Sequence, residues 1–434
     1  MMNQKLMQKN INLLIKNCVV SDREVKDCVR RFFDDEGKSY HILSDDATLY
    51  YDVVQSICKV VNITTESNID RRLISIIRSH KLNGSNFSDN DLKNLLDVYK
   101  NAQIANVRIF KKVHGLCVLS NEPREIGGFI FYDSEKHRQM LSSYIQNLGF
   151  SNDFVSEMME GFSSHKTWVS SLIETYIVPS IDNPKINEDG KEEIIATEVF
   201  ECLQSVLRWL ISFSRHPYDI GLFEDVGILD YKVSNENNTI ILGDDKNPII
   251  RQSLMGSTFN PTNELEINAI INYAKEKGIV DLEKVFLLCR NRANETKMDK
   301  RLISAIKFYG RAFYNLPKPV SLLESVASIE ALVGDKDDKI RSRFGEYLTF
   351  LLSNSANVDS KIRLEGIFKK LYDKRSALAH GSSSDVKESD CKDALHYAKM
   401  LIFVFLTKKE LVMMKTLDDL DEYIKKLKFA VPIK

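Results

Sequence analysis

Two histidines in the chain each follow an arginine with four or five residues between them, a combination of side chains that suits a site handling a phosphate group. Arg108 precedes His114 with five residues between them, and Arg375 precedes His380 with four. An imidazole titrates near neutral pH and can exchange a proton, whereas a guanidinium stays charged and can bond two phosphate oxygens. Both pairs are therefore candidates, and the secondary structure expected around them separates the two.

Apolar and polar residues alternate from Val107 onward, which predicts a strand. Six residues on a strand, at roughly 3.3 Å each, place Arg108 and His114 about 20 Å apart, too far for one phosphate group. Lys112 lies on the same side of this strand. We therefore expect Arg108, Lys112 and His114 to form a solvated basic face.

The second pair falls in a segment with helical periodicity. Five residues at about 1.5 Å each separate Arg375 from His380 by about 7.5 Å along a helix axis, but by roughly 140° around it. Gly381 follows His380 directly, so the helix is expected to end there and the backbone to leave helical geometry. The reach of the arginine, or a second copy of the motif across a dimer, can close the remaining gap.

Charge is distributed unevenly along the chain. With 60 Lys+Arg, 61 Asp+Glu and a formal net charge of −1, the protein is not a histone-like polycation. Between Lys361 and Arg375, however, basic side chains outnumber acidic ones by six to two. Such a helix can follow a phosphate backbone through Lys369, Lys370 and Lys374. The alternative is an ordinary solvated helix face, with His380 as a helix cap.

Composition restricts the class of protein. The low content of glycine and proline, 18 and 9 residues in 434, favours long helices. Seven scattered cysteines with no CxxC spacing indicate buried free thiols rather than a zinc site. Phosphate-loop, dinucleotide-binding, HExxH and GxSxG motifs are absent, so we expect no metal and no cofactor. The N-terminus lacks a signal-peptide core and the longest apolar run, residues 400–406, is too short to span a membrane, so we expect a cytoplasmic location.

We predict a mainly α fold, α+β overall, in three parts. Residues 1–260 form an α+β N-terminal region with a small antiparallel sheet, residues 261–412 a helical bundle, and residues 413–434 a helical tail. Within the first part we expect mostly helices up to residue 100, a pair of strands at 107–119 and 128–132 around a turn at 121–124, a surface loop at 181–190, and a second small sheet at 226–242.

Helix ends in the C-terminal part carry recognisable signals. Thr262 or Asn263 can cap a helix that stops at Gly278. Ser321 and Glu324 have the spacing of a capping box, which would open a helix over residues 322–333.

The segment LYDKRSALAHG, from Leu371 to Gly381, resembles the YxxRSxxxHG signature of the HEPN superfamily and is closest to its Apea-like group. Three further segments are similar to the family's helices in the same order. They are residues 322–332 (LLESVASIEAL), residues 340–344 (IRSRF) and residues 394–406. The resemblance covers residues 265–412, about a third of the chain. Ser382 stands where relatives paired with a nucleotidyltransferase antitoxin often carry a tyrosine, so that form of regulation is not indicated.

The resemblance implies an up-and-down bundle that forms a homodimer, with the two motifs facing each other. Many members are metal-independent endoribonucleases in phage defence, abortive infection or toxin–antitoxin systems. The implied partner is RNA, and residues 1–260 would sense a trigger of phage origin. The alternative class is a non-catalytic dimerisation, ligand-binding or RNA-binding module, and a weaker one is a nucleotide-binding regulator.

The resemblance also implies roles for single residues. His380 would be the general acid and base when a ribose 2′-hydroxyl attacks the adjacent phosphate. Arg375 would bind that phosphate, and Ser376 would orient one of these two side chains. Glu330 either pairs with Arg375 or is an exposed mid-helix residue, and Tyr372 packs in the core rather than contacting a base.

Overall fold

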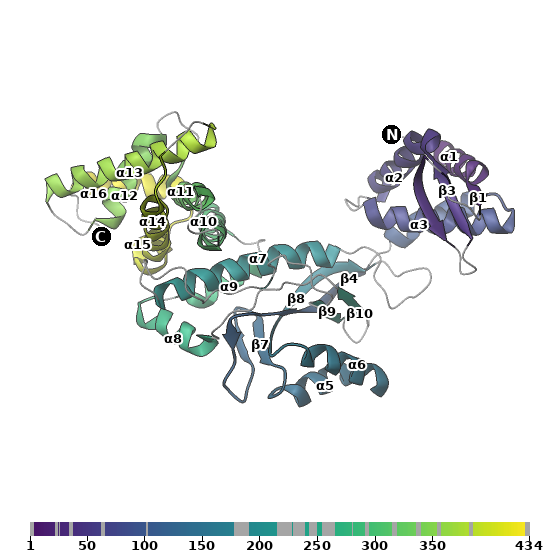
Figure 1. Ribbon diagram of the computed structural model, residues 1–434, viewed down its shortest axis with the longest axis horizontal. Coiled ribbons are helices and arrows are strands. Elements are labelled where there is room, and N and C mark those ends of the chain that lie inside the picture. The colour runs from purple at the N-terminus through teal and green to yellow at the C-terminus, as the bar shows by residue number, and fades with distance from the viewer. Residues whose placement is uncertain are drawn as a thin grey trace. The chain divides into compact units, whose positions relative to one another are not determined.

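The computed structural model describes most of the chain. The described residues are 4–21, 25, 27–33, 38–61, 66–100, 103–177, 191–214, 228, 239–242, 250–253, 265–279, 281–290, 295–314, 319–335, 340–353, 357–381 and 385–429. The expected loop at 181–190, most of the second sheet at 226–242, Thr262, Asn263 and Ser382 lie outside them. The protein is mainly helical and has a small antiparallel sheet in its N-terminal region (Figure 1), as predicted.

The chain divides into two compact units. The first comprises residues 1–107, 173–195 and 242–251, and the second comprises residues 108–172, 196–241 and 252–434. Residues 108–172 therefore belong with the C-terminal helices, whereas the division made from the sequence places them in the N-terminal region.

The first unit packs helices against a three-stranded antiparallel sheet of order β1-β3-β2. Its elements are α1 (Gln4–Asn17), β1 (Val19–Ser21), β2 (Cys28–Phe33), β3 (Ser39–Leu43), α2 (Ala47–Val61), α3 (Glu66–Asn83) and α4 (Asp89–Lys100). Apolar side chains of all four helices and of the sheet form one core around the fully buried Tyr50 and Ile57. The prediction of a mostly helical start missed these strands, because segments of three to six residues are too short to show a clear period of two.

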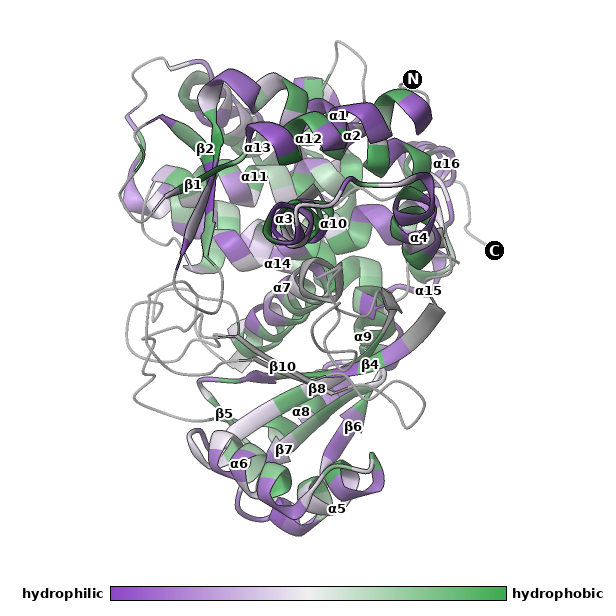
Figure 2. Ribbon diagram, turned by 90° about the vertical axis from the view of Figure 1, so that its right-hand side faces the viewer, coloured by the Kyte–Doolittle hydropathy of each residue, from purple (hydrophilic) through white to green (hydrophobic). Residues whose placement is uncertain are grey.

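The second unit contains residues 108–112 of β4 (Gln103–Lys112), residues 167–172 of β8 (Thr167–Ile177), β7 (Phe129–Asp133) and β6 (Arg124–Ile126). In the sheet they are neighbours in the order β4-β8-β7-β6. Two strands at its edge, β9 (Thr239–Leu242) and β10 (Ile250–Ser253), lie beyond β4, and β5 (Leu116–Cys117) pairs separately with β11 (Leu265–Glu266). Most residues of β7 are hydrophobic (Figure 2). The expected pairing of the 107–119 and 128–132 strands is wrong, because β8 lies between them and β7 forms its hairpin with β6.

Helices cover both faces of this sheet (Figure 1). On one face, α5 (Arg138–Asn147) and α6 (Asn152–Ser163) place Tyr144 and Phe162 against Phe110. On the other, α7 (Lys191–Ile211) and α9 (Leu282–Arg290) place aromatic rings against Phe129. The expected solvated basic face of β4 is therefore wrong: Lys112 is only 2% exposed and Arg108 is half-buried.

Helix α8 (Ile267–Glu276) follows β11 and lies beside α9 (Figure 1). The C-terminal bundle comprises α10 (Lys297–Tyr314), α11 (Pro319–Val333), α12 (Ile340–Leu352), α13 (Val358–Ala379), α14 (Glu388–Thr407), α15 (Lys409–Val412) and α16 (Leu417–Lys428). The buried centre is built from α10, α11 and α14, where Ile306, Ile329 and Leu401 are fully buried. Helix α13 is peripheral, since Phe368 and Leu371 are the buried residues among its 22. None of the described helices is both long enough and apolar enough for a membrane span.

Ser321 does not cap α11. The described helix already begins at Pro319, and Ser321 is completely buried with a hydroxyl that has no hydrogen-bond partner among the described residues. Glu324 instead pairs with Arg311 of α10 at 3.2 Å. The seven cysteines are free, and six of them are buried, as predicted.

Candidate functional site

Arg375 of α13 pairs with Glu330 of α11 in the centre of the candidate site. Its Nη2 donates to Oε2 of Glu330 at 2.9 Å, and both side chains are largely shielded from solvent. The sequence left open whether Glu330 pairs with Arg375 or is an exposed mid-helix residue, and in the structure the two residues are paired. A carboxylate in this position holds the guanidinium in one orientation, because each freezes the rotamer of the other.

The electrostatics of the pair leave the arginine with unused bonding capacity. Burial raises the pKa of Glu330, and the positive charge of Arg375 opposes this only in part. The Nε–H of Arg375 is buried and has no acceptor among the described residues. Glu330 accepts from one of the five N–H groups of the guanidinium, and the side chain is 28% exposed, so its solvent-facing donors can bond an additional anion without breaking the bond to Glu330.

A cleft of ≈ 650 Å³ opens beside this pair. Its walls include Arg375, Glu330 and Tyr372 together with Lys297 and Arg301 of α10. The ring of Tyr372 also packs on Phe344 of α12, with 5.5 Å between ring centres. Tyr372 therefore packs, as expected, but it is only half-buried and also lines the cleft.

Lys297 and Arg301 were not predicted as site residues. Nη1 of Arg301 donates to the carbonyl of Ala331 at 2.8 Å and Nη2 donates to the carbonyl of Gly334, so this arginine caps the C-terminal end of α11. Burial lowers the pKa of Arg301. The one signal in the sequence was their spacing of four residues, which places both on one face of a helix.

His380 lies apart from the cleft. It is the C-terminal cap of α13, its N–H donates to the carbonyl of Ser376 at 3.1 Å, and its side chain is exposed. Gly381 follows with φ of +69°, which ends the helix as predicted. Because α13 stays helical through Ala379, the angle around its axis keeps His380 off the wall that carries Arg375.

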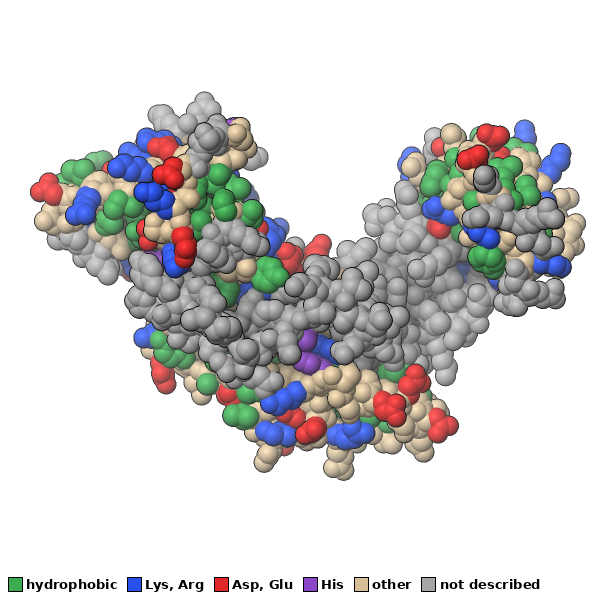
Figure 3. Space-filling view, viewed as in Figure 1, with side chains coloured by type: hydrophobic (Ala, Val, Ile, Leu, Met, Phe, Trp, Pro, Cys, Tyr) green, Lys and Arg blue, Asp and Glu red, His purple; other side chains and the backbone are tan. Residues whose placement is uncertain are grey.

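The lysines expected to follow a phosphate backbone are mostly paired with carboxylates. Lys369 pairs with Glu365 and Lys374 with Asp390, each at 2.5 Å, while Lys370 is exposed. On the face of the bundle seen in Figure 3, basic side chains are interspersed with acidic and hydrophobic ones. The local excess of positive charge on α13 is therefore smaller in the structure than in the sequence.

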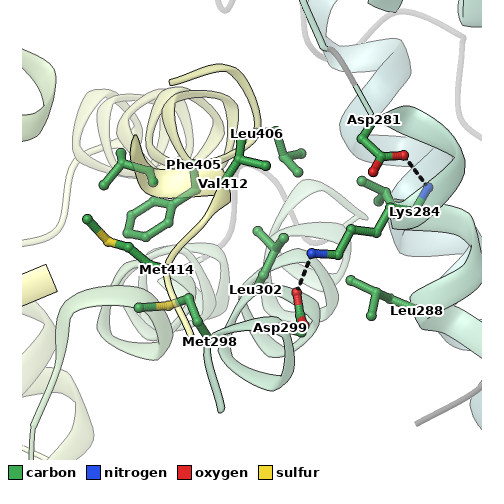
Figure 4. Close-up of a pocket in the computed structure, with 12 residues that line it drawn as sticks. Asp281, Lys284, Leu288, Met298, Asp299, Leu302, Phe405, Leu406, Val412 and Met414 are labelled. Carbon is green, nitrogen blue, oxygen red and sulfur yellow. Dashed lines mark hydrogen bonds and ion pairs between the residues drawn. The ribbon is translucent and has the colours of Figure 1, made fainter. Parts of the chain in front are cut away.

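A second, smaller cavity lies between α9, α10 and the segment around α15 (Figure 4). Its volume is ≈ 30 Å³, and apolar side chains such as Phe405, Met298 and Met414 surround one ion pair, Lys284 with Asp299 at 3.0 Å. A space of this size accommodates only water-sized molecules. The cleft beside Arg375 remains the candidate site.

Comparison of the chain with protein-family models, with curated proteins and with solved structures finds no match. The features that bear on function are therefore the motif on α13 and the cleft beside Arg375 and Glu330, called the α11–α13 cleft below.

Proposed function

We propose that the protein is a metal-independent endoribonuclease of HEPN type that acts in anti-phage defence or abortive infection. The observation that carries the proposal is the position of Arg375. The arginine of the motif lines a cleft of ≈ 650 Å³, is oriented by Glu330, and has a buried Nε–H for which the described residues supply no acceptor. An oriented guanidinium suits an RNA phosphate, and Lys297 and Arg301 add positive charge to the same cleft, which the negative charge of Asp335 offsets in part.

The reaction needs a proton carrier beside the bound phosphate. The ribose 2′-oxygen forms a bond to phosphorus while the bond from phosphorus to the 5′-oxygen breaks, which leaves a 2′,3′-cyclic phosphate and a 5′-hydroxyl. An imidazole takes the proton of the 2′-hydroxyl and supplies one to the 5′-oxygen, the role that the motif gives to His380. Ser376, one residue after Arg375, would orient one of these side chains.

A homodimer would bring the imidazole to the phosphate, because His380 does not line the cleft of its own chain. Helix α13 has the surface for such contact. Val358 and Ile362 are 67% and 62% exposed, and Ile367 is also exposed. In this arrangement His380 of a second copy approaches the phosphate held by Arg375. Residues 1–260 would then sense a trigger of phage origin and restrain or release the nuclease.

The test is cleavage of total RNA by the purified full-length protein in the presence of EDTA. We expect products with cyclic phosphate ends, and we expect Arg375→Ala and His380→Ala each to reduce the rate by at least about 100-fold. Arg363→Ala, which removes an exposed arginine on the same helix, is the matched control and should cleave normally. Cleavage that persists in both site variants would rule out the proposal.

The alternative is a non-catalytic module that binds RNA or another ligand, and the position of His380 outside the cleft favours it. It predicts that the protein retains RNA without cutting it, and that only Arg375→Ala weakens retention. A filter-binding assay run beside the cleavage assay distinguishes the two.

A further inference from the structure

Two arginines meet on the sheet of the second unit, on elements other than those that form the α11–α13 cleft. Arg108 of β4 donates from Nη1 to the hydroxyl of Ser170 on β8 at 3.1 Å. Arg290, the last residue of α9, donates from Nη2 to the carbonyl of Leu172 on β8 at 3.0 Å. Ser170 and Leu172 are alternate residues of one strand, about 7 Å apart, so both guanidinium groups are held over the same short stretch of β8.

The β6–β7 hairpin leaves room for Arg290. Gly128 has φ of +75°, and a Cβ at this position would lie 1.5 Å from Nη1 of Arg290. Strand β7 pairs with β8 only as far as Phe129 opposite Ser171. The carbonyl of Leu172 lies just past this last pair, where Arg290 supplies it with a donor.

Arg108 is fixed from two sides. The guanidinium carbon of Arg108 lies 5.5 Å from the centre of the Tyr144 ring. The hydroxyl of Ser170, which accepts from Arg108, lies 3.5 Å from the hydroxyl of Tyr132. Two guanidinium groups and two hydroxyl groups are thus held along one short stretch of β7 and β8, and they are the kind of donor that proteins use for phosphate groups.

Among the described residues, no carboxylate forms an ion pair with Arg108 or Arg290. Burial lowers the pKa of Arg290, and the positive charge of Arg108 lowers it further. The negative charge of Glu125 raises the pKa of Arg290, but in the described part of the chain no ion pair joins Glu125 to either arginine. The Nε–H groups of Arg108 and Arg290 are both buried and have no acceptor among the described residues. Neighbouring positive charges and unpaired donors are unfavourable without an anion.

We infer that Arg108, Arg290, Ser170 and Tyr132 form a binding site for a phosphate group, either free or carried by a nucleotide. A tetrahedral phosphate can accept from both guanidinium groups and both hydroxyls and supplies the missing negative charge, whereas a single carboxylate offers two oxygens and one charge. The site is independent of the nuclease proposed for the bundle.

The experiment is calorimetric titration of the full-length protein with inorganic phosphate, AMP and acetate at equal ionic strength. We expect phosphate or AMP to bind and acetate not to bind. If AMP binds at least about tenfold more tightly than phosphate, the ligand is a nucleotide. If the two bind with equal affinity, the ligand is free phosphate.

Arg108→Gln and Arg290→Gln should each weaken phosphate binding by about tenfold or more. Arg138→Gln is the matched control, because Arg138 makes the same kind of bond, Nη1 to the Ser163 hydroxyl at 2.7 Å, on the exposed surface of α5. Should a glutamine variant fail to fold, Arg108→Lys and Arg290→Lys keep the charge without the bidentate geometry and should still bind more weakly than the wild type. Absence of binding to the folded wild type, or equal loss in the Arg138→Gln control, would overturn the inference.

Discussion

Glu330 and Arg375 are joined by a 2.9 Å hydrogen bond between helices α11 and α13, and the carboxylate is the more buried partner. The pair connects the buried centre of the bundle to its most exposed long helix. It therefore matters both for the stability of α13 and for the direction in which the guanidinium points.

The first prediction concerns the pH dependence of stability when this pair is broken. The pKa of Glu330 in the folded protein lies above its ordinary value of 4.5. The protonated carboxyl group therefore stabilises the fold at low pH, and this stabilisation is lost as pH rises through the folded pKa. Arg375→Ala removes the compensating charge, raises this pKa further, and should cost roughly 1–3 kcal/mol at pH 8 but less at pH 4.5. Urea unfolding across this range measures the effect.

The control for that experiment is the double variant Glu330→Gln with Arg375→Ala. It has no buried carboxylate at this position, so the additional loss between pH 4.5 and pH 8 should disappear. An equal loss in the single and double variants would mean that Arg375 stabilises α13 by packing rather than by charge.

A second prediction concerns Asp299 in the first turn of α10 (Figure 4). Burial raises its pKa, but bonds from Lys284 and from the hydroxyl and N–H of Thr296 outweigh burial, so the pKa is lowered. A lowered carboxyl pKa stabilises the fold above the unfolded pKa, near 3.9, and this contribution is lost as pH falls through the folded pKa. Asp299→Asn should therefore cost about 1–2 kcal/mol at pH 7 and converge with the wild type in acid. Thermal unfolding of the variant and the wild type at pH 7 and in acid tests this prediction. A difference in stability that does not change with pH would contradict it.

The third prediction concerns the end of α13. Gly381 has φ of +69° with open space around the position of a Cβ, so Gly381→Ala meets no clash but must adopt a left-handed conformation. We expect a loss of about 1 kcal/mol in unfolding free energy, and a smaller loss for Gly381→Asn, which tolerates this conformation better. Equal costs for alanine and asparagine would show that another effect dominates. A nuclease that depends on His380 should also slow in Gly381→Ala.

A fourth prediction separates self-association from folding. Ile362 is 62% exposed on α13, whereas Ile329 is completely buried on α11. Ile362→Asp should leave the unfolding free energy within about 0.5 kcal/mol of the wild type but weaken the proposed homodimer. Ile329→Ala should cost roughly 2–5 kcal/mol. Analytical ultracentrifugation and urea unfolding measure the two effects, and an unchanged sedimentation profile for Ile362→Asp would exclude α13 as the contact surface.

Features governed by nearby residues were predictable from the sequence. Gly381 ends α13 as predicted, because helix termination depends on residues within one or two turns. The free cysteines followed from their scattered spacing. The positions of Arg375 and His380 on one helix were also predictable from local sequence. The same spacing fixes the angle around the helix axis that keeps the two side chains apart.

Only the tertiary structure determined which distant residues meet. The burial of Lys112, the insertion of β8 between β4 and β7, and the approach of Arg301 to Arg375 all depend on packing between segments far apart in the chain. A polar residue on a strand looks solvated in the sequence, since alternation cannot show that helices cover both faces of a sheet. For the same reason, the sequence could not decide whether Glu330 pairs with Arg375. The two residues are 45 positions apart, and only the packing of α13 on the bundle brings them together.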